Sequence, residues 1–520
     1  MRPCWAFGLI LLALPASGGD TRASDPWFRS GRVAVERARA RVGPTPRARN
    51  VILFLGDGMG MSTITAARIF AGQQAGNPGE EHQLSFERFP NVGLIKTYNT
   101  NQQVPDSAGT MTAIVSGVKT KAGVLGVDDT IVFDDWTSVA PARVPTLFEE
   151  AEERGLATGI VTTARITHAT PAACYGHAAH RNWETDSLLS HEARKHDFPD
   201  LARQLVEFPA GDGIDVVLGG GRVMFLPANA KDPEEPEVAG LRFDERNLME
   251  EWQKRYPLGR AIWNQAQFDA VDPRGTRKLL GLFDPSHMDF ELDRNSDKGG
   301  EPSLSEMTAK AIDILRQSEE GFLLLVEGGR IDHAHHANNA HRALVETVEF
   351  ARAVQVALDR TNRAETLLVV TADHSHPLNL AGYVTRGNPI LGKARENPLD
   401  GSEPKLALDG AGRPYATLSY GLGPGHTGAT ELQPAGPKQF PHFEPKSFEP
   451  AQGRPDLTEV DTTDPGYLQE ALVPRYSGTH SGEDVAVFAD GPGAALFFGV
   501  QEQHYLYHAL VEAMARPAEE

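Results

Sequence analysis

The chain has 520 residues, of which 40% are hydrophobic and 23% are charged, a composition typical of a globular protein with a large core. Its formal net charge of −20 argues against nucleic acid or an anionic membrane as the main partner. The charge is compatible with sites for divalent cations, and an anionic substrate would then need the local positive field of bound metal.

The N-terminus has the pattern of a secretory signal peptide. A positive start is followed by an apolar run at 5–15 and by small residues, so we predict a signal peptide at 1–23 and a periplasmic or secreted protein. The apolar run is too short to span a bilayer, and we expect no membrane span elsewhere. Cys4 leaves with the signal and Cys174 remains alone, so no internal disulfide is expected.

The next segments predict an N-terminal arm and the first strand of a sheet. Residues 24–45 include a run with helical spacing, which we interpret as the arm. The apolar run 51–55 is typical of a strand buried on both faces. It leads into the glycine-rich turn 56–60, whose spacing is not that of a dinucleotide-binding loop. The glycines can instead bring the backbone close to an ion held by Asp57.

Similar apolar runs recur and alternate with helical patterns. This alternation predicts an α/β fold with a large, mostly parallel central sheet and helices on both faces. We expect the catalytic domain to comprise 46–376 and 480–516, with an acidic insertion at 226–301 and a Gly- and Pro-rich subdomain at 377–479. The predicted strands include 157–163, 216–219, 322–326, 366–370 and 485–489, and the predicted helices include 145–154, 304–317 and 338–359.

The segment 105–110, Pro-Asp-Ser-Ala-Gly-Thr, lies between a strand-like run at 92–98 and a helix-like run at 111–118. A serine that opens a helix is usually an N-cap. Alternatively, Ser107 is a nucleophile at a helix N-terminus, a position that suits phosphate. Serine needs a base or a metal to activate it, so the remaining question is what activates Ser107.

Carboxylates and imidazoles crowd the end of the strand at 322–326. Glu327 follows this strand, and Asp332 and His336 are four residues apart, so a helix would place both on one face. A carboxylate and a neutral imidazole are suitable zinc ligands. Taken alone, this cluster is equally compatible with a solvated polar loop.

Two further clusters strengthen the metal interpretation. Asp373 and His374 follow the strand at 366–370, and His480 precedes the strand at 485–489. Together with Asp57, they place ligand-type residues at four sheet edges, which favours a shared polynuclear metal site. We expect three other histidines to support the site or lie on the surface rather than ligate: His335, His341 and His376.

Two more pieces would complete a phosphate site. His168 and Thr170 follow the strand at 157–163 and offer an imidazole and a hydroxyl. Arg181 is able to grip a phosphate with two parallel hydrogen bonds, although a surface arginine is the simpler interpretation of that residue alone.

Taken in order, these stretches resemble the alkaline phosphatase family, and the resemblance reaches from about residue 50 to 505. It implies metal-dependent hydrolysis of phosphate monoesters through a phosphoserine at Ser107, with Arg181 clamping the phosphate and Asp106 orienting the arginine. The matching stretches are 56–60, 105–110, 168–171, 181–183, 326–336, 371–376 and 479–484. The implied ligands are Asp332, His336 and His480 for one zinc, Asp57, Asp373, His374 and Ser107 for a second zinc, and Asp57, Thr170 and Glu327 for magnesium.

The resemblance has further implications. His168 and His333 stand where animal-type members carry histidines, although export without disulfides fits a bacterial member. A homodimer is implied, with 24–45 similar to the arm that wraps the partner subunit and 377–479 similar to the crown. A calcium site is also implied, with ligands from Glu234, the carbonyl of Phe283, Asp284 and Glu301.

Two alternative functions stay open at this point. One is a phosphodiesterase or sulfatase of the same superfamily, and the other is a non-catalytic exported protein that binds metal. A metalloprotease is disfavoured because the chain has no His-Glu-x-x-His.

Overall fold

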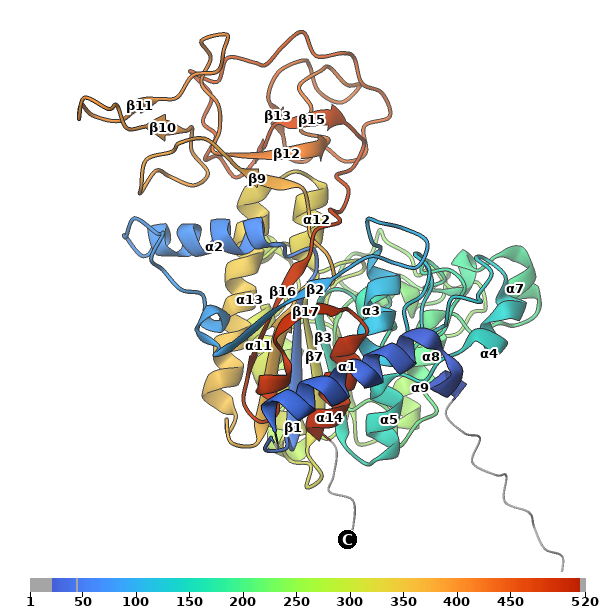
Figure 1. The fold of residues 1–520 in the computed structure, drawn as a ribbon. Helices are drawn as coiled ribbons and strands as arrows, with labels where there is room; N and C mark the ends of the chain where they lie inside the picture. The colour runs from blue at the N-terminus through green and yellow to red at the C-terminus, as the bar shows by residue number, and fades with distance from the viewer. Residues whose placement is uncertain (1–20, 44, 515–520) are drawn as a thin grey trace, which may run out of the picture.

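The structure is a computed structural model that describes residues 21–43 and 45–514 (Figure 1). Residues 1–20 of the predicted signal peptide therefore lie outside the described residues. Ten strands form one large sheet in the order β17-β2-β16-β8-β1-β7-β3-β4-β6-β5. Their bounds are β1 Asn50–Gly56, β2 Asn91–Lys96, β3 Ala157–Arg165, β4 Val216–Gly220, β5 Arg260–Ile262, β6 Leu279–Leu282, β7 Phe322–Gly328, β8 Thr366–Thr371, β16 Val485–Asp490 and β17 Gly499–Glu502.

The sheet is parallel except at one strand, so the predicted α/β fold with a mostly parallel sheet is confirmed. β16 runs antiparallel to both of its neighbours, β2 and β8, and the other adjacent pairs are parallel. The central strands β7 and β8 are buried along their whole length, which explains their nearly continuous apolar sequences.

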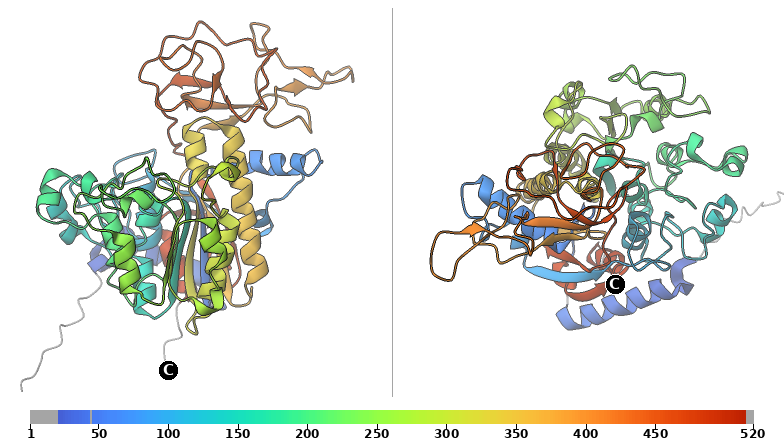
Figure 2. Two further views of the ribbon diagram at one scale, coloured as in Figure 1. Left: turned by 180° about the vertical axis from the view of Figure 1, so that it is seen from behind. Right: turned by 90° about the horizontal axis from the view of Figure 1, so that it is seen from above.

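Helices cover both faces of the sheet (Figure 2). The longest, α13, is amphipathic and packs against α11 and α2. The helix bounds are α1 Pro26–Val42, α2 Met61–Gln74, α3 Ser107–Ser116, α4 Val139–Ala142, α5 Leu147–Glu153, α6 Ala169–Ala172, α7 His191–Lys195, α8 Leu201–Val206, α9 Leu248–Arg255, α10 Gln265–Asp269, α11 Leu304–Leu315, α12 Arg330–His336, α13 Ala340–Arg360 and α14 Tyr505–Met514.

The N-terminal helix α1 packs against the C-terminal helix α14 of its own chain (Figure 1). The Phe28 ring lies 4.7 Å from the His508 ring, and Ser30 Oγ lies 3.0 Å from His504 Nε2. Gly31 sits directly against the His508 ring, where a larger side chain would clash. The arm-like helix is thus docked on its own subunit in this structure.

Residues 378–474 contain three small sheets that stand beyond one end of the large sheet (Figure 1). Their strands are β9 Leu378–Leu380, β10 Arg395–Glu396, β11 Lys405–Leu406, β12 Leu418–Gly423, β13 Lys438–Gln439, β14 Tyr467–Leu468 and β15 Ala471–Pro474. The segment between β8 and β16 is therefore folded into small sheets and is not one extended loop.

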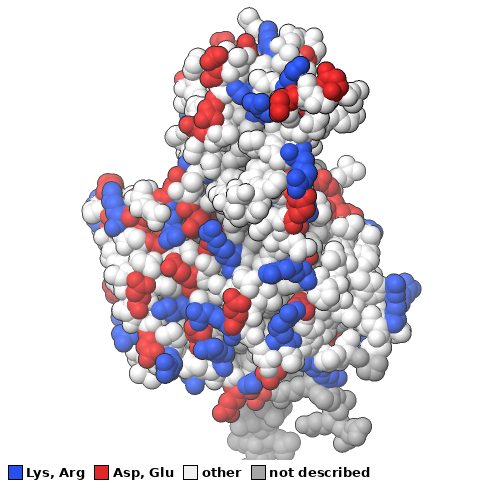
Figure 3. Space-filling model, turned by 90° about the vertical axis from the view of Figure 1, so that its left-hand side faces the viewer, with Lys and Arg blue, Asp and Glu red and all other residues white. Residues whose placement is uncertain are grey.

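Two further features concern helix hydrophobicity and surface charge. Within the described residues, no helix is long and apolar enough to cross a bilayer. Acidic and basic side chains are interspersed over the face drawn in Figure 3, without the continuous basic stripe that a polyanion-binding surface would need.

Candidate active site

The predicted site residues meet at the edge of the sheet where the parallel strands end. Asp57 follows β1, Glu327 lies near the end of β7, and Asp373 follows β8. Because β16 runs in the opposite direction, its start lies at the same edge, and this brings in His480 just before it. Strand ends are where α/β sheets carry their sites, so the topology explains why residues so far apart in sequence converge.

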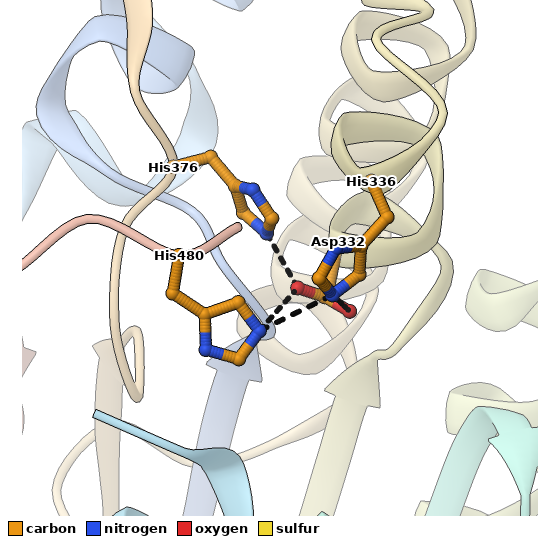
Figure 4. A group of neighbouring side chains, drawn as sticks. All are labelled: Asp332, His336, His376 and His480. Carbon is orange, nitrogen blue, oxygen red and sulfur yellow. Dashed lines mark hydrogen bonds and ion pairs between the residues drawn. The ribbon is translucent and has the colours of Figure 1, made fainter. Parts of the chain in front are cut away.

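The first ligand group comprises Asp332, His336, His376 and His480 (Figure 4), whose candidate ligand atoms all lie within 4.8 Å of one another. His336 Nε2 is 3.2 Å from Asp332 Oδ2 and 3.2 Å from His480 Nε2. Burial lowers the pKa of His480 to about 3, so this imidazole is neutral and suited to ligation. His376 Nε2 contacts Asp332 Oδ1 at 2.5 Å, the contact expected of a residue that supports the carboxylate.

The second group contains Asp57, Asp373 and His374, again with ligand atoms within 4.8 Å of one another. His374 Nε2 lies 3.2 Å from Asp373 Oδ2 and 3.1 Å from Ser107 Oγ. The His374 ring stacks on His480 with 3.5 Å between ring centres, so the two groups adjoin. Ser107 therefore points its oxygen into a ligand cluster.

A third set of oxygens lies beside the second group. Both carboxylate oxygens of Asp57, the Thr170 hydroxyl and Glu327 Oε1 are buried without a hydrogen-bond partner. Burial and the neighbouring carboxylates raise the pKa of Glu327 to about 8. Unpartnered buried oxygens are costly unless a cation satisfies them, so these residues fit a hard divalent ion.

The start of helix α3 corrects one detail of the sequence interpretation. Asp106, and not Ser107, is the N-cap, because its side chain accepts from the backbone N–H of Ala108 at 3.0 Å. Asp106 also accepts from the N–H of Gly123 at 2.9 Å and pairs with Arg181. Burial raises the pKa of Asp106 and Arg181 lowers it, with a net decrease to about 2. The carboxylate therefore stays ionised and holds the guanidinium beside Ser107.

The predicted histidines His168 and His333 lie together, and the structure adds a third, His287. Ring centres are 5.4 Å apart for the predicted pair, 5.2 Å for His168 and His287, and 4.2 Å for His287 and His333. His168 Nε2 also contacts Arg181 Nη2 at 3.1 Å. His287 was not identified from the sequence, because this residue lies in no recognisable motif. Only its position shortly after the end of β6 could have indicated it.

The residues of the predicted calcium site lie in one acidic region, but they are farther apart than the residues of the two ligand groups described above. Glu234, Asp284 and Glu301 belong to none of the groups of described residues whose ligand atoms lie within 4.8 Å of one another. Glu234 accepts from Arg222 at 2.8 Å, and Phe283 is buried. Burial raises the pKa of Glu301 to about 10 and that of Asp284 to about 7, and Glu301 Oε2 has no hydrogen-bond partner.

A serine at a helix start, an arginine paired with the preceding aspartate, and two adjoining groups of carboxylates and imidazoles make up one site. These residue types are the ones that metal-dependent phosphoryl transfer requires. The family model for alkaline phosphatase matches residues 48–516. The chain is 43% identical over 473 residues to the tissue-nonspecific alkaline phosphatase of Gallus gallus, covering 90% of this chain and 84% of that protein. It is also 43% identical over 476 residues to the alkaline phosphatase of Gadus morhua, covering 90% and 92% of the two chains.

Solved structures agree on the fold. The Thermus thermophilus alkaline phosphatase matches with a TM-score of 0.62 and 23% identity, covering 91% of this chain and 92% of that one. A cold-active alkaline phosphatase from Shewanella sp. matches with a TM-score of 0.57 and 26% identity, covering 90% and 100%. The chain belongs to the alkaline phosphatase family, and it is a phosphoric monoester hydrolase.

Proposed function

We propose that the site uses two zinc ions and one magnesium ion, and the observation that carries this is a pair of adjoining ligand groups, one of which contacts Ser107 Oγ through His374. The neutral imidazoles and carboxylates match the donor preferences of zinc, and the all-oxygen set matches magnesium. The first zinc would be held by Asp332, His336 and His480, the second by Asp57, Asp373, His374 and Ser107, and magnesium by Asp57, Thr170 and Glu327.

In the proposed reaction, Ser107 is the nucleophile. Its Oγ forms a bond to phosphorus as the bond to the alcohol oxygen breaks, and a water then cleaves the phosphoserine to release inorganic phosphate. Arg181 and the backbone N–H groups at the start of α3 would meet the non-bridging oxygens, and Asp106 keeps Arg181 in place. Bound zinc would supply the electrophilic stabilisation of the attacking and leaving oxygens.

Ser107→Ala tests the nucleophile. We expect the variant to lose about 10³-fold or more of kcat on 4-nitrophenyl phosphate and to form no phosphoserine detectable by mass spectrometry after an acid quench. Folding and metal content should stay as in the wild type. A variant that retains its rate would overturn the nucleophile assignment. Rates on a matched diester and a sulfate ester test the alternative hydrolase activities.

The homodimer, the exported location and the division into domains are further proposals. Support for a dimer comes from the resemblance of 24–45 to a family arm, although α1 here packs on its own α14. Sedimentation of the mature chain and of a form without α1 would test both the dimer and the arm. We also propose a catalytic domain at 46–376 and 480–516 and a crown-like subdomain at 377–479.

We propose calcium as a further ion, held in the acidic region by Glu234, the carbonyl of Phe283, Asp284 and Glu301. The support is chemical: the side chains of Glu234 and Glu301 are buried, and Glu301 has an oxygen without a hydrogen-bond partner. Calcium titration followed by calorimetry should show a site that Glu301→Gln weakens and that excess magnesium does not fill. Equal calcium affinity in wild type and variant would rule out this ligand set.

A further inference from the structure

His287 lies beside both predicted site histidines, in the loop that follows β6. Its ring meets His168 edge-on, at 5.2 Å and 83°, and meets His333 at 4.2 Å and 62°. We propose that His287 is a positioning residue for the phosphate clamp, acting on Arg181 through His168. The inference rests on the proposed role of Arg181 in holding the phosphoryl group.

The loop that carries His287 is fastened to neighbouring strand ends. The carbonyl of Asp284 accepts from the N–H groups of Gly221 and Arg222, each at 3.0 Å. The N–H of Met288 donates to the carbonyl of Thr163 at 3.1 Å. The backbone on both sides of His287 is therefore fixed relative to β3 and β4, so its ring is a stable support rather than a mobile surface group.

Arg165 holds the imidazole of His287 from the other side. Its Nη1 lies 2.5 Å from His287 Nε2, and its backbone N–H lies 3.1 Å from His287 Nδ1. A neutral imidazole has one lone pair, so one of these contacts is a hydrogen bond and the other is packing. Arg165 is itself anchored by two contacts to Glu184, at 2.8 and 2.7 Å.

His168 transmits this support to the clamp. A guanidinium only donates, so His168 Nε2 must accept from Arg181 at 3.1 Å. The other terminal nitrogen of Arg181 bonds to Asp106, so the guanidinium plane is fixed from two sides. If the His168 ring turned, one of these two anchors would be lost. The His287 ring packs edge-on against the His168 ring and so restricts its rotation.

The three rings also form a group that could hold a metal ion, with candidate ligand atoms within 4.8 Å of one another. In this arrangement, however, each ring's lone pair has an N–H donor: Arg181 for His168, the backbone or guanidinium of Arg165 for His287, and Arg330 for His333. A lone pair that accepts a hydrogen bond is not free to bind zinc. The contacts therefore favour a packed support over a further metal site.

The test compares three substitutions at one position. His287→Ala removes the ring and the acceptor, His287→Phe keeps the ring, and His287→Asn keeps a polar acceptor without the ring. We expect His287→Ala to raise the KM for 4-nitrophenyl phosphate and the inhibition constant for inorganic phosphate about tenfold, with kcat within about twofold. His287→Phe should recover most of the phosphate affinity, and His287→Asn should not.

A double-mutant cycle separates positioning from general structural damage. In an Arg181→Ala background, His287→Ala should cause no further loss of phosphate affinity, because the clamp is already absent. His191→Ala, at an exposed histidine, is the matched control and should match the wild type. The inference is overturned if His287→Ala leaves phosphate affinity unchanged, if its effect persists without Arg181, or if the wild type binds an extra zinc ion that the variant lacks. An inactive wild type would instead refute the proposed function.

Discussion

The strand-end site and the acidic segment 226–301 both bury carboxylates, but they neutralise them by different means. At the strand ends, Asp57 is fully buried and neither of its oxygens has a hydrogen-bond partner. At the acidic segment, the buried guanidinium of Arg222, which precedes the segment, bonds to Asp232 at 2.7 Å through each of two nitrogens and to Glu234 at 2.8 Å. Unpartnered carboxylates therefore mark where an ion is needed, and arginine-paired ones mark a permanent structural link.

A third arrangement is seen at Glu152, which is nearly buried beside β3. Burial raises its pKa to about 8, although the Thr158 hydroxyl donates to it. Such a carboxyl group stays protonated near neutral pH, so it loses its charge without an arginine partner. The three cases predict three different responses of activity or stability. Chelation should act through Asp57, loss of an arginine through Asp232 and Glu234, and a change of pH through Glu152.

Chelation should have the largest effect. Removing metal with EDTA is expected to lower kcat/KM about 10³-fold or more, because several kcal/mol of transition-state stabilisation would be lost. It should also lower the melting temperature, because the carboxylates of Asp57 and Asp373 would remain buried without a cation. Zinc and magnesium together should restore both quantities. A chelated enzyme with an unchanged rate would contradict the metal assignment.

Arg222→Ala, just before the acidic segment, should strongly destabilise that segment. Its side chain is fully buried, and its loss would leave Asp232 and Glu234 uncompensated, at a cost of about 3–5 kcal/mol. Urea unfolding measures the change. Arg246→Ala, which removes a partly exposed pair with Glu251, is the control and should cost no more than about 1 kcal/mol.

Calcium refines this prediction. If calcium restores the stability of Arg222→Ala, the acidic segment accepts an ion in place of the arginine. The acidic segment and the strand-end site would then neutralise their carboxylates in the same way. If calcium does not restore the stability, Arg222 is the permanent partner of Asp232 and Glu234, and Glu234 does not belong to the calcium ligand set.

The sequence indicated most of the strand-end site because the proposed ligands lie close to apolar runs that are typical of buried strands. Asp373 and His374 illustrate this, since they lie just after β8. The order of strands could not be derived, because pairing between distant runs leaves no local pattern. His287 was missed for a related reason: it joins the site only through the pairing of β6 with β4 and the fold of the following loop.

The helix start at Ser107 shows the limit of local rules. Both Asp106 and Ser107 are residues that cap helices well, and the sequence does not distinguish them. Asp106 is the cap because its carboxylate also accepts hydrogen bonds from the backbone N–H of Gly123 and from Arg181. Both donors lie later in the chain. The calcium ligands were the least predictable, because acidic residues in an irregular segment give no periodic pattern.

Glu152→Gln should have a smaller effect that depends on pH. Below about pH 4.5, the carboxyl group is protonated in both the folded and the unfolded chain, so it makes no difference to stability. Between about pH 4.5 and 8, the unfolded chain loses the proton while the folded chain keeps it, so wild-type stability falls across this window. Glutamine cannot ionise, so the variant should melt several degrees above the wild type at pH 9 and close to it at pH 4.

The smallest expected effect is at Tyr420, in β12 of the small sheets, and it tests how far the strand-end site depends on that region. Its hydroxyl lies 2.7 Å from His335 Nδ1, and the His335 ring stacks at 5.0 Å on His376, which supports Asp332. Tyr420→Phe removes one hydrogen bond and keeps the ring. The loss should be about 1 kcal/mol of stability and less than about threefold in kcat.

Zinc affinity is the more informative measurement for Tyr420→Phe. The hydroxyl contacts His335 and not Asp332, so the zinc dissociation constant should change by no more than about threefold, less than the 10–100-fold typical when a ligand's direct partner is lost. His376→Ala removes the direct partner of Asp332 and should reach that larger range. If Tyr420→Phe weakens zinc as much as His376→Ala does, the small sheets take part in holding the metal, and the strand-end site is not self-contained.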